Sequence, residues 1–197
     1  MKKRVSLFGL LVTVFVFSSA VARADQLAFT ATLTGSQEVP PSGSPGIGSA
    51  LVTLDTVTNL LTVNVSFAGL LSPTIASHIH CCTPPGANAL VATAVPTFPG
   101  FPLGVTTGTY LMTFDLTVAS TYNPAFITAH GGTVAGAQAA FIAGLTSGQT
   151  YLNIHTTQFP GGEIRGQLNA VPEPATLLLL TTGIAGVVGA VRKRKRE

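Results

Sequence analysis

The chain has 197 residues, and its ten lysine and arginine residues outnumber its seven acidic residues, which gives a formal net charge of +3. Nine of the ten basic residues lie in the two terminal segments. Residues 25–170 therefore keep one positive charge, Arg165, against five carboxylates, a net charge of −4. A body without a basic face excludes nucleic acid as a partner.

The N-terminal segment has the form of a secretory signal peptide. Lys2-Lys3-Arg4 precede an apolar run at residues 5–17, and Ala22-Arg23-Ala24 supplies the small residues that signal peptidase requires. The apolar run is too short for a membrane anchor. We predict a signal peptide at residues 1–24, cleaved after Ala24.

The body, residues 25–170, is rich in Thr, Val, Gly, Ala and Pro, a composition that favours strands and turns. Alternation of apolar and polar residues predicts a series of short strands. In chain order these are residues 27–34, 49–55, 60–68, 74–80, 90–94, 107–116, 150–156 and 163–168. Residues 134–145 have mixed three and four spacing of apolar residues and are the one helix predicted in the body. The pattern indicates an all-β Greek-key sandwich, immunoglobulin-like or superoxide-dismutase-like, with one short helix.

Histidines are placed on two of the predicted strands. His78 and His80 lie on one face of their strand, about 6.5 to 7 Å apart along the backbone, and His155 lies on a later strand. If these strands pair or face each other, three imidazoles converge, and such a set suits copper or zinc. The alternative is that each histidine is a buried structural group that donates to a backbone carbonyl. Both interpretations stay open at this point.

Cys81 and Cys82 directly follow His80, and the chain has no other cysteine. In an oxidising exterior they can form a vicinal disulfide, pair with another molecule, remain free thiols or ligate a soft metal. We favour the vicinal disulfide or the free thiols over metal ligation.

Glu163 and Arg165 alternate onto one face of the last strand, and we predict an ion pair between them. No Gly-x-Ser-x-Gly elbow, phosphate loop or helical His-Glu pair occurs, and Glu163 has no second carboxylate near it in the sequence. The expectation is therefore a protein that is not an enzyme.

The C-terminal segment, residues 171–197, combines three parts. Pro172-Glu173-Pro174 is followed by an uncharged segment at residues 175–191, about 25 Å long as a helix, and by a basic cluster at residues 192–196. This length is at the short limit for a transmembrane helix, and the basic cluster would stay cytoplasmic. The order resembles the PEP-CTERM sorting tail of bacteria that make extracellular polysaccharide. The resemblance implies recognition by an exosortase, cleavage near the Pro-Glu-Pro motif, and release or attachment at the cell surface; permanent membrane anchoring is the alternative.

Three motifs of the body resemble the CHRD domain: residues 29–41, the His78-Ile79-His80 triplet, and residues 151–168 with Pro160-Gly161-Gly162-Glu163. The resemblance covers about residues 27–168 and implies a β-sandwich in an extracellular setting. The chain departs from the family where Cys81-Cys82 follows the His-x-His motif, because a glycine and proline loop is usual there. A His-x-His pair on a Greek-key sandwich is also similar to the copper site of copper, zinc superoxide dismutase.

Together these features predict an exported surface or extracellular-matrix protein with a binding or structural role, associated with exopolysaccharide. The alternative is a copper- or zinc-binding sandwich with a His78, His80 and His155 site, with redox activity as a further element. The expected partners are signal peptidase and exosortase during processing, the membrane through the tail before processing, and extracellular polysaccharide.

Overall fold

The computed structural model describes residues 26–172. The predicted signal peptide with Ala22 and Ala24, the Glu173 and Pro174 of the sorting motif, the predicted transmembrane segment and the basic cluster lie outside the described residues. Within residues 26–172 no helix is long and apolar enough to cross a membrane.

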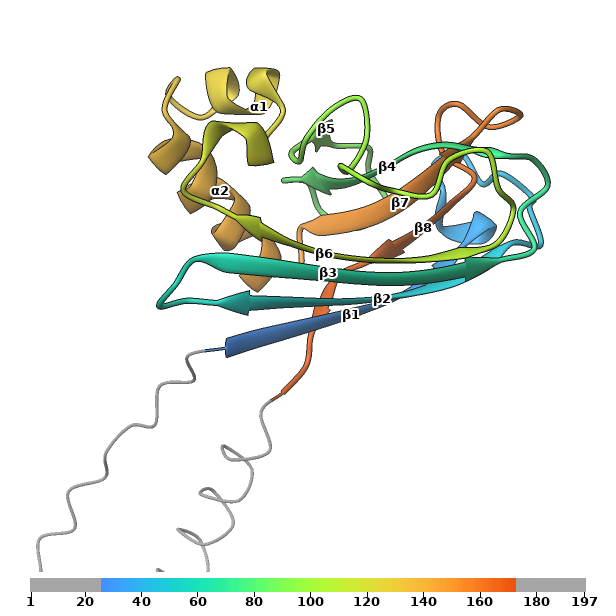
Figure 1. The fold of residues 1–197 in the computed structure, drawn as a ribbon, viewed down its shortest axis with the longest axis horizontal. Coiled ribbons are helices and arrows are strands. Elements are labelled where there is room, and N and C mark those ends of the chain that lie inside the picture. The colour runs from blue at the N-terminus through green and yellow to red at the C-terminus, as the bar shows by residue number, and fades with distance from the viewer. Residues whose placement is uncertain (1–25, 173–197) are drawn as a thin grey trace, which may run out of the picture.

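The described residues form nine strands in one antiparallel sheet that curls on itself (Figure 1). The strands are β1 (Gln26–Thr34), β2 (Ile47–Asp55), β3 (Leu60–Ala68), β4 (Thr74–Cys81), β5 (Leu90–Val91), β6 (Gly108–Asp115), β7 (Thr150–Thr156), β8 (Ile164–Gln167) and β9 (Asn169–Ala170). Their order is β5-β4-β7-β8-β1-β2-β3-β6, and β9 pairs with β1. In Figure 1, β1, β2, β3 and β6 form one layer, and β4 and β7 lie over it. The predicted all-β sandwich is confirmed, with both layers belonging to a single sheet.

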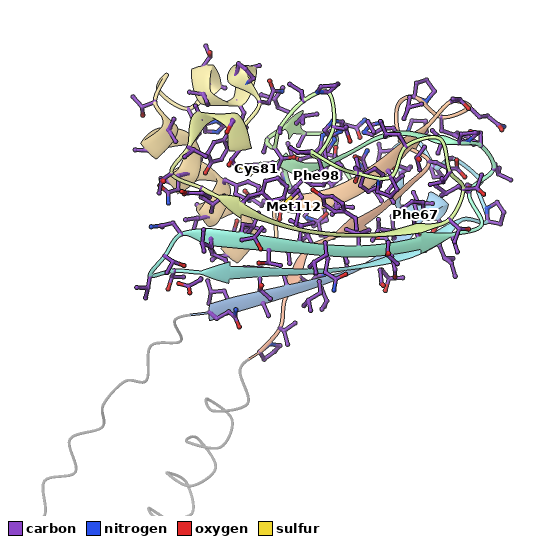
Figure 2. The ribbon with its side chains drawn as sticks, in the orientation of Figure 1. Phe67, Cys81, Phe98 and Met112 are labelled. Carbon is purple, nitrogen blue, oxygen red and sulfur yellow. A yellow bond between two sulfur atoms is a disulfide. The ribbon has the colours of Figure 1, made fainter. Side chains whose placement is uncertain are left out.

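The core lies between the two layers, where every second residue of β1, β2 and β3 is buried. Leu33, Val52 and Val63 are fully buried, and Phe98 enters the same core from a loop (Figure 2). Burying one such side chain stabilises the fold by about 1.5–3 kcal/mol. The apolar residues whose alternation predicts these strands are thus the residues that are buried in the core.

Two α-helices, α1 (Pro124–Ala129) and α2 (Val134–Thr146), close one end of the sandwich (Figure 1). Short 3-10 helices occur at Gly35–Gln37 and Ala119–Thr121. The side chain of Thr133 caps α2 by accepting from the Gly136 N–H at 3.1 Å. The predicted helix is confirmed as α2, whereas the six residues of α1 are too few to show a period in the sequence.

Strands β4 and β7 are buried on both faces, unlike β1, β2 and β3. One face, with Ile79 and Ile154, points into the apolar core. The other face is covered by loops whose carbonyl groups, such as those of Pro96 and Pro160, reach the side chains of the strands. A polar group on this second face is therefore removed from water but lies beside backbone acceptors.

Candidate metal centre

The pairing of β4 with β7 brings the three predicted histidines together. In the antiparallel register, Ala76 lies opposite His155, and His78 lies opposite Asn153. Alternation then places His78, His80 and His155 on the same face. One nitrogen from each imidazole lies within 4.8 Å of the others, and the three side chains are only 6–8% exposed.

Each imidazole is oriented by one backbone carbonyl. The acceptors are Pro96 O for His78 Nε2 at 2.7 Å, Ala89 O for His80 Nδ1 at 2.9 Å, and Pro160 O for His155 Nδ1 at 2.9 Å. A carbonyl can only accept, so each of these nitrogens carries the ring proton. The lone pairs of the neutral rings are consequently on His78 Nδ1, His80 Nε2 and His155 Nε2. Metal-ligating histidines are held in this way, with the second ring nitrogen donating to a carbonyl.

Burial favours the neutral form of all three rings. Burial lowers the pKa of His78 and of His80 to about 4, because the imidazolium form loses its hydration. The same cause lowers the pKa of His155. Neutral imidazole is the form that ligates copper and zinc, and no proton competes for these nitrogens near neutral pH.

The free lone pairs face one another. His78 Nδ1 and His155 Nε2 are 3.2 Å apart, and both are acceptors in the tautomers that the carbonyls impose. This distance is close to the edge of a tetrahedron with metal–nitrogen bonds of 2.0–2.1 Å, which is about 3.3–3.4 Å. His80 Nε2 is buried without a hydrogen-bond partner. A shared cation would satisfy the lone pairs of all three nitrogens.

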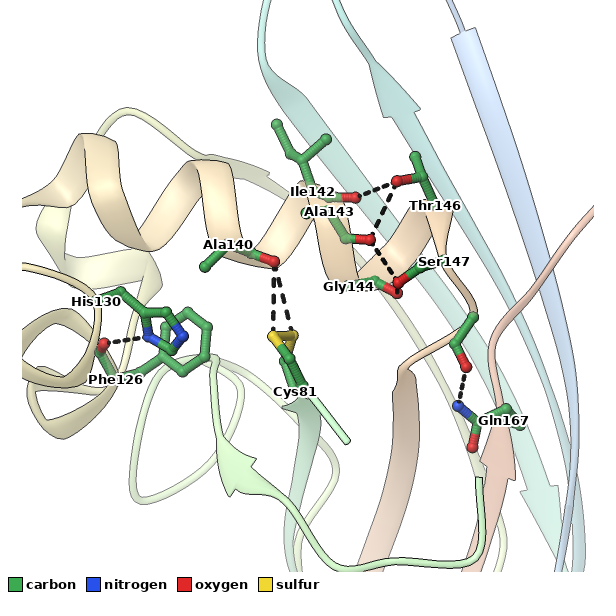
Figure 3. Close-up of a disulfide and its surroundings, with 12 residues drawn as sticks. Cys81, Phe126, His130, Ala140, Ile142, Ala143, Gly144, Thr146, Ser147 and Gln167 are labelled. Carbon is green, nitrogen blue, oxygen red and sulfur yellow. Dashed lines mark hydrogen bonds between the residues drawn. A yellow bond between two sulfur atoms is a disulfide. The ribbon is translucent and has the colours of Figure 1, made fainter. Parts of the chain in front are cut away.

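The fourth histidine of the chain lies elsewhere. His130 follows α1, and its Nδ1 is 2.9 Å from the carbonyl of Phe126 in the same helix (Figure 3). It is not a member of the histidine cluster among the described residues.

Cys81 and Cys82 are joined in a vicinal disulfide, one of the two favoured alternatives. Cys81 belongs to the apolar core, on the face of β4 opposite His78 and His80. Figure 3 shows the sulfur atoms against α2, where they lie 3.9 and 3.5 Å from the carbonyl oxygen of Ala140. The disulfide therefore packs the sheet against the helix and leaves no thiolate for a metal.

The predicted ion pair between Glu163 and Arg165 is wrong. Arg165 Nε lies 3.7 Å from Glu38 Oε2 and donates to the carbonyl of Gln37 at 2.5 Å. Glu163 precedes the first residue of β8 and follows the Gly161-Gly162 turn, so strand alternation does not govern its side chain. Its carboxylate instead accepts hydrogen bonds from Ser44, Leu71 and Thr156.

Two residues near the histidines, Tyr151 and Glu38, are not among the site residues predicted from the sequence. Tyr151 stacks on the His80 ring with centroids 4.7 Å apart, and the Arg165 guanidinium lies 4.5 Å from the centre of the same tyrosine ring. The side chain of Asn153 is 2% exposed. Glu38 lies near it, and burial raises the pKa of the Glu38 carboxyl to about 7. Strand alternation from His155 places Asn153 on the histidine face from the sequence alone, and the same alternation extended by two residues would have placed Tyr151 there. No local pattern leads to Glu38.

These features define a β-sandwich domain with a buried polar centre between a strand pair and its covering loops. The model of the CHRD domain matches residues 29–168, and the chain belongs to this family. The PEP-CTERM protein-sorting motif matches residues 170–195. No curated protein and no solved structure matches the chain.

The sorting motif gives the location of the protein. It indicates export and C-terminal processing by an exosortase, so the protein is a cell-surface or extracellular protein. The predicted family, sorting tail and location are thereby confirmed.

Proposed function

We propose that this exported protein binds one copper or zinc ion through His78, His80 and His155, and that it acts by binding rather than by catalysis. The observation that carries the proposal is the convergence of three unprotonated imidazole nitrogens in a buried site. Imidazole nitrogen suits both metals. Only the copper form supports redox activity, because zinc has no redox chemistry.

If the three histidines had a purely structural role, only half of their six ring nitrogens would have hydrogen-bond partners among the described residues. The carbonyls of Pro96, Ala89 and Pro160 satisfy one nitrogen of each ring. The remaining nitrogens have no donor: His78 Nδ1 faces His155 Nε2, and His80 Nε2 has no partner. A buried polar atom without a partner costs about 1–3 kcal/mol. A bound cation removes that cost at all three positions.

Metal analysis of the full chain tests the proposal. After equilibration with Cu²⁺ or Zn²⁺ and removal of free metal, we expect one ion per chain. His78→Ala removes one of the three histidine ligands. It should weaken metal binding by more than about 100-fold, which is more than the loss of a group that only orients a ligand would cause. His130→Ala is the matched control and should keep one ion per chain. Absence of stoichiometric metal in the unmodified protein would remove the proposal.

A second candidate function is association with uncharged extracellular polysaccharide through the outer face of the sheet. The antiparallel register aligns four hydroxyl side chains across β1, β2, β3 and β6: Thr32, Ser49, Ser66 and Thr109. A groove of about 590 Å³ lies on this face and has no charged lining residue. Its residues are Thr30, Ala31, Thr32, Ser49, Ala50, Leu51, Asn64, Ser66 and Asn169. Hydroxyl and amide groups both donate and accept hydrogen bonds, as sugar hydroxyls do.

Affinity electrophoresis in gels containing neutral polysaccharide from the producing cells tests this surface. We expect the polysaccharide to retard the unmodified protein and Ser66→Asp to lose most of this retardation. Bound polysaccharide would cover the new carboxylate, which would lose its hydration without gaining a partner. Thr157→Asp introduces the same charge at an exposed position outside the groove and should be retarded like the unmodified protein. Equal migration with and without the polysaccharide would contradict the proposal.

A further inference from the structure

Asn153 lies beside the three histidines. It is directly opposite His78 in the β4–β7 register and two residues before His155 on the same face of β7. Its side chain is 2% exposed, and its amide faces both the His80 ring and the Glu38 carboxyl. The amide of Asn153 is thus a neighbour of all three imidazoles.

Within residues 26–172, His80 and Asn153 each have a buried acceptor atom without a donor. Both His80 Nε2 and Asn153 Oδ1 are buried and unpartnered among the described residues. His80 Nδ1 already holds the ring proton, so its Nε2 has a lone pair, as does the amide oxygen. His78 Nδ1 and His155 Nε2, which face each other, likewise both have a lone pair and no donor in the described part of the chain. The centre therefore contains three imidazole nitrogens and one amide oxygen, all with lone pairs available.

We propose that Asn153 Oδ1 is the fourth protein ligand of the metal ion, which makes the centre a closed site of three nitrogens and one oxygen. This inference rests on the proposed metal-binding function. Four protein ligands complete a tetrahedron, as in structural zinc sites, and leave no position for a ligand from solvent. A closed site fits a protein that binds its metal without catalysis.

Glu38 and Gly162 lie beside the Asn153 amide. The amide also faces the carboxyl of Glu38, which is 5% exposed and pairs with Arg165 at 3.7 Å. Gly162 lies against both side chains, and a Cβ atom at this position would overlap Glu38 and come within 2.9 Å of Asn153 Nδ2. Supporting contacts of this kind orient ligands in metal sites.

Anion binding by the metal-loaded full chain tests the inference. The protein is loaded with Co²⁺ or Cu²⁺, and sodium azide is added while the visible absorption of the metal is recorded. A closed site predicts no change in the unmodified protein. Asn153→Ala opens the fourth position, so azide should then cause a saturable spectral change. Gln167→Ala is the control, because it removes a neighbouring amide whose Nε2 donates to Gly148 O. This variant should behave like the unmodified protein.

Asn153→Asp provides a second readout that keeps the size of the side chain. It replaces a neutral oxygen ligand by a charged one, so we expect metal affinity to rise at least about tenfold. An azide response in the unmodified protein equal to that of Asn153→Ala would overturn the inference, as would unchanged metal affinity in Asn153→Asp. Failure of the unmodified protein to bind any metal would instead overturn the proposed function.

Discussion

Replacing Glu163 with alanine is expected to lower the free energy of unfolding by about 3–6 kcal/mol, because three donors lose their acceptor together. Glu163 is fully buried, and its carboxylate accepts from Ser44 Oγ, Leu71 N and Thr156 Oγ1, each at 2.6 Å. These donors belong to the loop after β1, the loop after β3, and β7. One carboxylate therefore joins three segments that are far apart in the chain.

Denaturation of the full chain in guanidinium chloride measures this effect. Glu163→Gln keeps one carbonyl acceptor and should lie between the unmodified protein and Glu163→Ala. Asp55→Ala is the matched control: its carboxylate also accepts from two backbone N–H groups, Val57 and Thr58, but it does so at the surface where water replaces it. Its effect should be much smaller. Similar losses for Glu163→Ala and Asp55→Ala would show that the buried network contributes little.

Gly144→Ala should destabilise the domain by about 1–2 kcal/mol, although alanine is the better helix former by about 1 kcal/mol. Gly144 lies in α2 and is buried against the disulfide. A Cβ atom there would overlap Cys81 Sγ and lie 3.1 Å from Cys82 Sγ. The disulfide is held on both sides and cannot withdraw as a flexible side chain could. Steric overlap therefore outweighs helix propensity at this position.

A double-mutant comparison separates the two effects, with thermal unfolding as the measurement. In a chain carrying Cys81→Ala and Cys82→Ala, the sulfur atoms are absent, and Gly144→Ala should be neutral or stabilising because only propensity remains. If Gly144→Ala destabilised both backgrounds equally, contact with the disulfide would not be its cause.

The strands and α2 could be predicted from the sequence because their signals are local. The alternation at Leu60–Ala68 gives the bounds of β3 as observed, and the mixed three and four spacing that begins at Val134 gives the start of α2. The same alternation predicts that His78 and His80 share a face. Each of these statements depends only on residues within one element.

Partners that come from distant segments could not be predicted in this way. Glu163 and Arg165 are two residues apart and opposite in charge, yet Arg165 pairs with Glu38 from the other end of the domain. The turn at Gly161-Gly162 directs Glu163 to other donors, and the sequence contains no local sign of that choice. Cys81 and Cys82 are adjacent, but their position against α2 follows from the packing of the helix on the sheet.

The sequence by itself determined a secreted β-sandwich, its family motifs and sorting tail, and the three residues that are candidates for a metal. Only the tertiary structure decided that these residues converge and that Asn153 lies among them. The physical reason is the β4–β7 register, in which Ala76 faces His155 and His78 faces Asn153. Residues more than seventy positions apart meet there because one face of both strands must pack in the core. The other face then brings its imidazoles together beneath loops that supply the carbonyl acceptors.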